Sequence, residues 1–434
     1  MRRREQKLSI GRRIKGYLND RQFFAFLCLL YYPFNNTISD RLIFGAIAPF
    51  IFLVIGLILL IPDFKHKITK KSIVTSGTVL AIVVFLIINN KIFGTGLYNI
   101  SQFILQISYL LLLPVLINIK INSKSFTKAL RVFAIEHLIG TALPVLAPHF
   151  YSETVLSFIC KGRKFCFAQI GFNSGINAGF TSHYSTNGCY LTIAALFFAS
   201  LSMDENRKKS DTLLLILSIV ALLIIGKRAH LIFATFSIIV GYIVSTKAKK
   251  AKHITTRSLK ILIITLTAII SFIPLSQSIP QISTTIDRII ESNSSNDITN
   301  GRQPLYNLAI DEWKKSPIIG NGWGGYIQAS HEVFGSTKYH VDYIHAHNDY
   351  LELLCDCGIV GLMLYLIVLF YLLIKFIRKT SPNANSILKP MLVLFCILYG
   401  ITGTPLSIPS IYVTQIIIIA IEEKYDEKNR SNYL

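Results

Sequence analysis

The chain has 434 residues, of which 52% are hydrophobic and 15% are charged, and its mean hydropathy is +0.51. This balance excludes an ordinary soluble globule. Apolar runs recur from end to end, and each is long enough to cross a hydrocarbon layer of roughly 30 Å as a helix. Long segments that alternate with period two are absent, which disfavours an outer-membrane barrel. The sequence therefore predicts an all-α polytopic membrane protein.

We predict about twelve transmembrane helices in one polytopic membrane domain, residues 1–434. The predicted spans are 22–38, 42–62, 73–89, 97–118, 129–148, 187–203, 212–226, 229–246, 258–277, 356–377, 388–403 and 405–421. Residues 1–21 are basic and polar, and no small-residue cleavage site follows the first apolar run. No cleavable signal peptide is therefore expected.

The net charge of +21 reflects membrane topology rather than nucleic-acid binding. With the N-terminus in the cytoplasm, alternate loops are cytoplasmic, and these loops carry most of the 44 Lys and Arg residues. Such an excess is the positive-inside pattern. It predicts that both termini are cytoplasmic and that nucleic acid is not a partner.

The same topology places one large polar loop, residues 278–345, outside the cytoplasm and before the last three helices. Thr284–Glu291 and Gln303–Lys315 show helical apolar spacing, which predicts short amphipathic helices within this loop. In the second of them, one face would carry Leu305, Leu308, Ala309 and Trp313. A glycine-dense turn at 318–326 follows.

Lys227 and Arg228 occupy a tight outer turn between two apolar spans. A charged side chain near lipid depth costs at least about 2.5–3.5 kcal/mol, so a partner or an anionic ligand is expected. One interpretation is snorkelling to lipid phosphates, and the other is a pyrophosphate clamp, because the arginine fork matches phosphate oxygens. In the large loop, Arg288 and Arg302 are further candidates for the clamp.

Two features of another predicted outer loop, which begins at residue 151, allow more than one interpretation. Cys160 and Cys166 would form a local disulfide in an oxidising compartment or remain two thiols. Residues 171–187 are rich in Gly and small polar side chains. Such a backbone suits a cavity edge that offers N–H groups to an anion, and it equally suits a plain connection.

His347, two residues after the large loop, has three interpretations. It is a surface residue, a metal ligand, or a general base whose ordinary pKa suits proton transfer near neutral pH. The metal-ligand set would be His340, Asp342, His345, His347 and Asp349, but a helical His-Glu-x-x-His spacing is absent. As a base, the ring would be oriented by Asp349 or Glu352.

Two sequence patterns in this region combine glycines with a polar motif. The first is the Pro-x-x-Gly-x-Gly turn at 317–322, which is followed by Trp323. The second is His347-Asn348-x-x-Leu351, followed by Gly358 and Gly361 at the start of a helix. Together they resemble the C-terminal signature of the O-antigen ligase and polysaccharide polymerase superfamily. Arg228 at the outer end of a span also fits, although many members have Ser where this chain has Lys227.

The resemblance implies a metal-independent transfer of a glycan from an undecaprenyl-pyrophosphate carrier to a hydroxyl acceptor, without a cofactor. Carried over to this chain, His347 activates the acceptor hydroxyl, and Arg228 and Arg302 bind the diphosphate. Further substrate contacts are expected from Lys227, Arg288, Asn348, Asp349, His345 and Trp323. The reaction would take place at the outer face of a bacterial cytoplasmic membrane.

Within the superfamily, the favoured function is a polymerase that joins lipid-linked repeat units into capsular, exo- or O-antigen polysaccharide. The first alternative is a ligase that moves finished glycan to lipid A-core or another acceptor. The second is a transporter or flippase for the lipid-linked oligosaccharide. Membrane lipid, a flippase and a chain-length regulator are the expected partners of the polymerase.

Overall fold

The fold is described from a computed structural model. The structure describes residues 20–31, 48–65, 70–93, 100–160, 162–181, 183–204, 207–248, 301–334, 344–407 and 409–420. These residues form helices and connections without a strand, and Phe64 and Ile119 make an isolated bridge. The all-α prediction is therefore confirmed for the described part of the chain.

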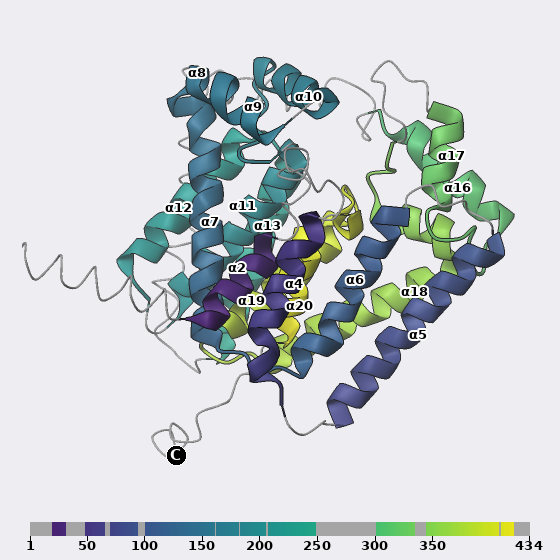
Figure 1. Cartoon of the computed structure of the whole chain (residues 1–434), viewed down its shortest axis with the longest axis horizontal. Coiled ribbons are helices and arrows are strands. Elements are labelled where there is room, and N and C mark those ends of the chain that lie inside the picture. Colours follow the sequence, from purple (N-terminus) through teal and green to yellow (C-terminus); the bar gives the residue numbers. More distant parts are fainter. Residues whose placement is uncertain are drawn as a thin grey trace, which may run out of the picture.

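Every predicted span except 258–277, which lies outside the described residues, overlaps a helix of the bundle (Figure 1). These helices are α2 (Arg21–Tyr31), α4 (Ala48–Leu60), α5 (Lys70–Phe93), α6 (Ile100–Ile117), α7 (Ser123–Leu146), α11 (Tyr184–Met203), α12 (Lys209–Ile224), α13 (Arg228–Ala248), α18 (Asp349–Arg378), α19 (Ala384–Tyr399) and α20 (Pro409–Ala420).

Five helices among the described residues are long and apolar enough to cross a membrane. They are Ser72–Asn89, Ser123–Leu146, Tyr184–Met203, Arg228–Thr246 and Asp349–Arg378. Arg21–Leu30, Ile51–Asp63 and Ala384–Tyr399 are apolar but shorter. The total of twelve spans and the cytoplasmic position of both termini stay predictions.

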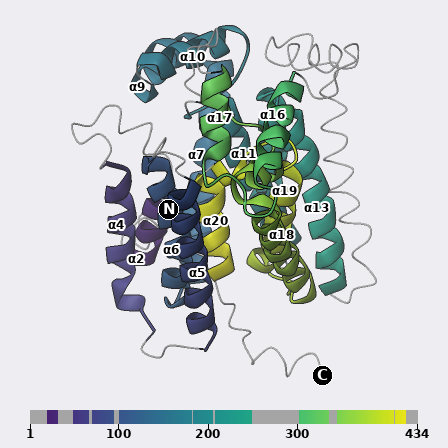
Figure 2. The ribbon, with the colours of Figure 1, turned by 90° about the vertical axis from the view of Figure 1, so that its right-hand side faces the viewer.

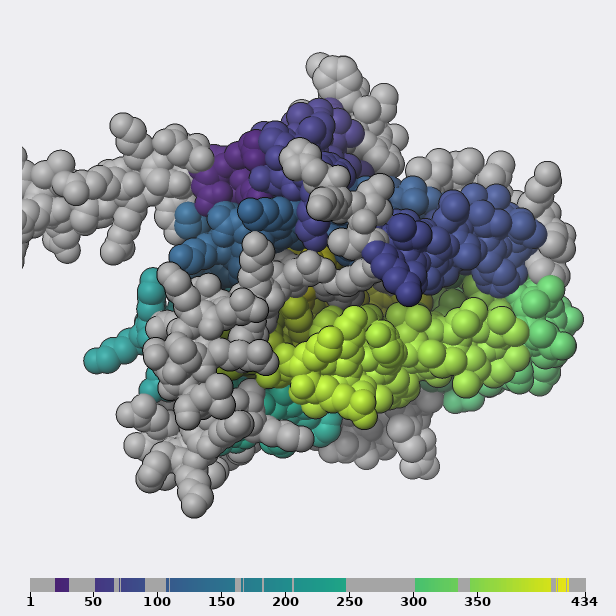
Figure 3. Space-filling view, turned by 90° about the horizontal axis from the view of Figure 1, so that it is seen from below, coloured from purple at the N-terminus to yellow at the C-terminus, as the bar shows by residue number. Residues whose placement is uncertain are grey.

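The central helix of the bundle is α11, which packs against α7, α12, α13, α19 and α20. Within α11, 94% of the most apolar window is buried, whereas the value for α18 is 17%. A helix that is apolar all round belongs either in a protein core or in lipid. The buried α11 is therefore a core helix, whereas α18 and the similarly exposed α5 are suited to contact lipid. These two helices form neighbouring ridges in Figure 3.

Two groups of short helices lie at one end of the bundle, as Figures 1 and 2 show from two directions. One group comprises α8 (Pro148–Phe150), the π-helical η4 (Tyr151–Val155), α9 (Leu156–Ile159) and α10 (Gly162–Asn173). The other comprises α16 (Gln303–Lys315) and α17 (Gly325–Phe334). Two 3-10 turns, η3 (Ile61–Asp63) and η6 (Pro405–Ser407), complete the described elements.

The predicted amphipathic helix at Gln303–Lys315 is confirmed as α16, with Leu305 and Ala309 buried. The helix predicted at Thr284–Glu291 lies outside the described residues. The structure adds α17, and α18 begins at Asp349 rather than at the predicted 356. With this earlier start, α18 begins two residues after His347.

Cys160 and Cys166 are not joined by a disulfide. Cys160 is buried and Cys166 is exposed, and both are free thiols. Of the two interpretations of this pair, the structure has the unlinked one.

Candidate functional site

The glycine-dense turn after α16 docks onto the start of α18 through main-chain hydrogen bonds. The N–H of Gly322 donates to the carbonyl of Asp356 at 3.0 Å, and the N–H of Ile359 donates to the carbonyl of Pro317 at 3.0 Å. These groups of α18 are available because its backbone leaves the helical conformation at Gly358, where φ is 62° and ψ is −168°. The turn therefore fills a break in the helix.

Glycine is required on both sides of this junction. A Cβ on Gly320 would overlap the carbonyl of Asp356, and a Cβ on Gly358 would overlap the carbonyl of Ile318. Both glycines also have a positive φ, which residues with a side chain rarely adopt. The two glycine patterns of the sequence are thus the two halves of one contact.

Side chains complete the junction. The carboxylate of Asp356 accepts hydrogen bonds from the N–H groups of Gly324 and Tyr326, both at 2.8 Å. The Asn321 amide nitrogen donates to the carbonyl of Glu312 at 2.6 Å. The turn, α16, α17 and the beginning of α18 therefore form one unit, on which the site is built.

Replacement of Gly358 by alanine should destabilise this unit. The backbone conformation alone disfavours a side chain by roughly 1–3 kcal/mol, and the overlap with Ile318 adds to this cost. We expect a lower melting temperature of the purified protein in detergent. Gly77 is the matched control, because a Cβ there meets nothing within 4 Å. Equal losses in G358A and G77A would contradict the role of the junction.

His347 lies immediately before the first turn of α18, in an unusual backbone conformation. Asn348 caps this helix, since its side-chain oxygen accepts from the N–H groups of Tyr350 and Leu351 at 3.0 and 3.1 Å. The φ of His347 is 54°, and no other non-glycine residue that the structure describes has a positive φ. Such conformations concentrate at functional sites.

Positive and imidazole side chains from separate segments lie within electrostatic range of His347. Arg302 precedes α16, Lys227 precedes α13, His183 precedes α11, and His345 lies two residues upstream. Burial, followed by the charges of Arg302 and Lys227, lowers the pKa of His347 from its usual 6.5 to about 3. Its imidazole is therefore neutral near pH 7.

Lys227 and Arg302 are held by groups that leave their charges uncompensated. The Lys227 Nζ lies 4.2 Å from the centroid of the Tyr184 ring, and the Arg302 Nη1 donates to the carbonyl of Thr402 at 2.8 Å. Neither side chain forms an ion pair with a carboxylate among the described residues. Two cations beside a neutral imidazole make an anion site.

Asp349 holds the loop that provides the Thr402 carbonyl. Its N–H donates to the carbonyl of Gly400 at 2.9 Å, and its Oδ2 accepts from the N–H of Leu406 at 2.8 Å. The residue is buried, and its Oδ1 has no hydrogen-bond partner among the described groups. These contacts support Arg302 indirectly, and a direct contact of Asp349 with substrate stays a prediction.

Glu352 orients the segment that leads into His347. Its Oε1 accepts from the N–H of Ala346 at 2.6 Å and lies 3.1 Å from the His345 Nδ1. Burial acts to lower the pKa of His345, but the Glu352 carboxylate outweighs it, so that this pKa is raised. Of the two acids that could orient the His347 ring, Glu352 therefore acts on the neighbouring histidine and the main chain.

Removal of the Glu352 side chain should misplace His347. If His347 is the base that the sequence predicts, we expect Glu352→Ala to lower the rate of glycan transfer about tenfold to a hundredfold, as small misplacements of a catalytic group do. Glu352→Gln keeps an acceptor for the Ala346 N–H and should retain more activity. Initial rates of both purified variants test this. Equal losses would assign the effect to the carboxylate charge and contradict the positioning role.

Four predicted site residues remain, and the structure describes the positions of three of them. Arg228 is the first residue of α13 and is half-buried. Trp323 is half-buried and packs against a cluster that contains Leu86 and Leu353. Asn348 uses its amide oxygen to cap α18. Arg288 lies outside the described residues. The substrate-binding roles of all four stay predictions.

A metal site is not assembled by the described residues, where no group of three or more His, Cys, Asp and Glu side chains is placed to hold an ion. His340 and Asp342, which belonged to the predicted ligand set, lie outside these residues.

The structure adds two groups that the sequence did not single out. His183 caps α11, its Nδ1 accepting from the N–H of Ser185 at 3.2 Å, and lies within electrostatic range of His347. It belongs to the segment 171–187, whose composition allowed a cavity edge. The second group is the carbonyl of Thr402, and no side-chain pattern signals a main-chain acceptor.

Residues 213–366 match a protein-family model described as O-antigen ligase. The match begins in α12 and ends within α18, so it includes Lys227, Arg302 and His347. It also contains the junction between the glycine-dense turn and Gly358. No curated protein matches the chain.

Proposed function

We propose that this chain is a membrane glycosyltransferase. The match of residues 213–366 to the O-antigen ligase model supports its membership of the O-antigen ligase and polysaccharide polymerase superfamily. The enzyme joins oligosaccharide repeat units carried on undecaprenyl pyrophosphate into capsular, exo- or O-antigen polysaccharide. The observation that carries the proposal is the neutral imidazole of His347 beside the uncompensated charges of Lys227 and Arg302.

The reaction needs one proton acceptor and one anion site. The acceptor hydroxyl loses its proton to His347 while its oxygen attacks the anomeric carbon of the donor sugar. A new carbon–oxygen bond forms, and the bond between that carbon and the diphosphate oxygen breaks. The electron pair leaves with the carrier diphosphate, whose charge Arg302, Lys227 and Arg228 stabilise.

Donor binding also adjusts the base. A histidine with a pKa of about 3 is neutral but weakly basic. The diphosphate brings negative charge beside Arg302 and Lys227, offsets their effect and raises the pKa of His347 in the complex. The imidazole thus becomes a stronger base only when the donor is present, which limits wasteful hydrolysis.

The ligase alternative is supported by the description of the matching family model. A ligase would use the same anion site and base, and would differ in its acceptor. In a deletion strain, a missing polymerase leaves single repeat units on the carrier. A missing ligase leaves full-length chains there.

Reconstitution tests the proposal directly. The purified protein in liposomes receives only lipid-linked repeat units, and glycan length is followed on gels. A ladder of longer glycans is expected. If the units cross the bilayer without elongation, the protein is a transporter and the proposal fails. If products appear only after a different acceptor lipid is added, the protein is a ligase. Added flippase and chain-length regulator should alter supply and length, but not the chemistry.

A further inference from the structure

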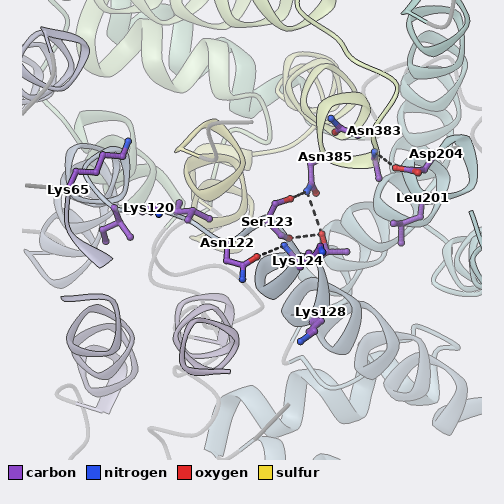
Figure 4. A pocket seen from close by; sticks show the side chains of 14 residues that line it. Lys65, Lys120, Asn122, Ser123, Lys124, Lys128, Leu201, Asp204, Asn383 and Asn385 are labelled. Atoms are coloured by element: carbon purple, nitrogen blue, oxygen red, sulfur yellow. Dashed lines mark hydrogen bonds between the residues drawn. The ribbon is translucent and has the colours of Figure 1, made fainter. Parts of the chain in front are cut away.

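A second polar site lies at the end of the bundle opposite His347. It is a pocket of about 650 Å³ between the start of α7, the end of α11 and the start of α19 (Figure 4). The central helix α11 connects the two sites: His183 precedes it beside His347, and Leu201 in its last turn lines the pocket. Its 20 residues separate the sites by about 30 Å.

Positive charge dominates the wall of this pocket. Four lysines line it, namely Lys65, Lys120, Lys124 and Lys128, against one acidic residue, Asp204. The Asp204 carboxylate already accepts from the N–H of Ala384 at 2.7 Å, and Lys128 pairs with Asp20 at 3.0 Å. Lys120 and Lys124 are exposed, and neither forms an ion pair with a carboxylate in the described ranges.

Asn385 adds a further polar side chain to the wall of this pocket. This pocket residue is 8% exposed, and its side-chain oxygen has no hydrogen-bond partner among the described groups. Its amide nitrogen donates to the Ser123 hydroxyl. Rotation of the amide by half a turn would let Ser123 donate to the oxygen and would leave the nitrogen, buried at the edge of the pocket, as a donor in need of an acceptor.

The rest of the wall is suited to an amphiphile. Ile119, Ile121 and Leu201 contribute aliphatic surface beside the lysine side chains. The helices α7 and α19 both begin at the pocket, so the positive ends of their dipoles face it. All these segments border connections for which the charge distribution predicts the cytoplasmic side, where the lipid surface is negative.

We propose that this pocket binds the phosphate group of an anionic glycerophospholipid from the adjacent leaflet. Lys120 and Lys124 contact the phosphate, the Asn385 amide supplies a hydrogen bond, and the aliphatic wall receives the glycerol end of the acyl chains. The site is separate from the proposed glycosyl-transfer site and does not depend on that activity.

Lipid binding to the purified full-length protein tests this assignment. The protein is placed in nanodiscs of phosphatidylcholine, and binding of added phosphatidylglycerol is measured by native mass spectrometry after extraction at an ionic strength of about 0.15 M, where only charges more than roughly 8 Å apart are largely screened. We expect a K120Q/K124Q double variant to bind phosphatidylglycerol roughly 30-fold more weakly, as expected for two lysines at an anionic headgroup.

The matched control is R378Q/K379Q, which removes two exposed cations near the end of α18, outside the pocket. It should retain wild-type binding. Equal weakening of both double variants would show diffuse attraction and overturn the site, as would equal retention of phosphatidylglycerol and phosphatidylcholine by the wild type. Competition by free glycerol phosphate at similar concentration would support the phosphate chemistry but overturn the lipid as its source.

Discussion

Replacement of His347 by asparagine should reduce glycan transfer by about 10²–10⁴-fold, the range that a positioned general base contributes. Asparagine is the informative choice because it tolerates a positive φ better than most residues do, and His347 has a φ of 54°. The backbone before α18 is therefore kept while the imidazole is lost. Initial rates of glycan elongation by the reconstituted variant give the measurement.

The control for this substitution is His149→Asn, which changes an exposed histidine of α8 at the same end of the bundle. It should elongate glycan at the wild-type rate. Unchanged chain lengths in H347N, at equal protein level, would remove His347 from the mechanism. A lowered melting temperature in H347N alone would point to a structural role instead.

Replacement of Arg302 by glutamine should lower transfer by about 10²–10³-fold, as the loss of a transition-state charge partner does. It should also alter the response to pH. In the free wild-type protein, the pKa of His347 is about 3, so kcat/KM should not lose this base until the pH approaches that value. The R302Q variant removes one of the charges that depress this pKa, so its kcat/KM should begin to fall at a higher pH.

The sign follows from the role of the base. Activity requires neutral imidazole, so it is lost as the pH falls through the pKa of His347, and a raised pKa moves that loss upward. In the wild type, the bound diphosphate should raise the pKa, which places the acidic limb of kcat above that of kcat/KM. Coincident acidic limbs would contradict electrostatic coupling between the donor and His347. The Lys314→Gln variant, in an exposed i,i+3 pair with Asp311, controls for general charge effects.

The sequence was enough to predict helices whose type and ends are set by their own residues. Gln303–Lys315 has helical spacing and its own stop at Ser316-Pro317, and it is α16. The spans could be placed because each apolar run is long enough to form a helix. The start of α18 was placed too late because Asp349–Glu352 is polar, and its helical state depends on the Asn348 cap and on the loop 400–406.

The sequence predicted only those site residues whose own side chains are chemically distinctive. Arg302, Lys227 and His347 are unusual residues at their positions, and the structure brings them together. His183 could not be assigned because its role arises from the packing of α11 against distant segments. The Thr402 carbonyl could not be assigned at all, since every residue has one. The sequence could not show that Glu352 contacts His345 rather than His347. The two histidines are only two residues apart, and the spacing allows either contact.

The junction at Gly358 has a consequence for which residues of this unit can vary. The turn and the helix are joined mainly by carbonyl and N–H groups, which every amino acid except proline provides. Ile318 and Ile319 in this turn are exposed and contribute their main-chain carbonyls to the surrounding contacts. Their side chains are therefore open to exchange while the glycines stay fixed. A framework of this kind keeps its shape through main-chain contacts, while the side chains on its surface are free to vary between related sequences.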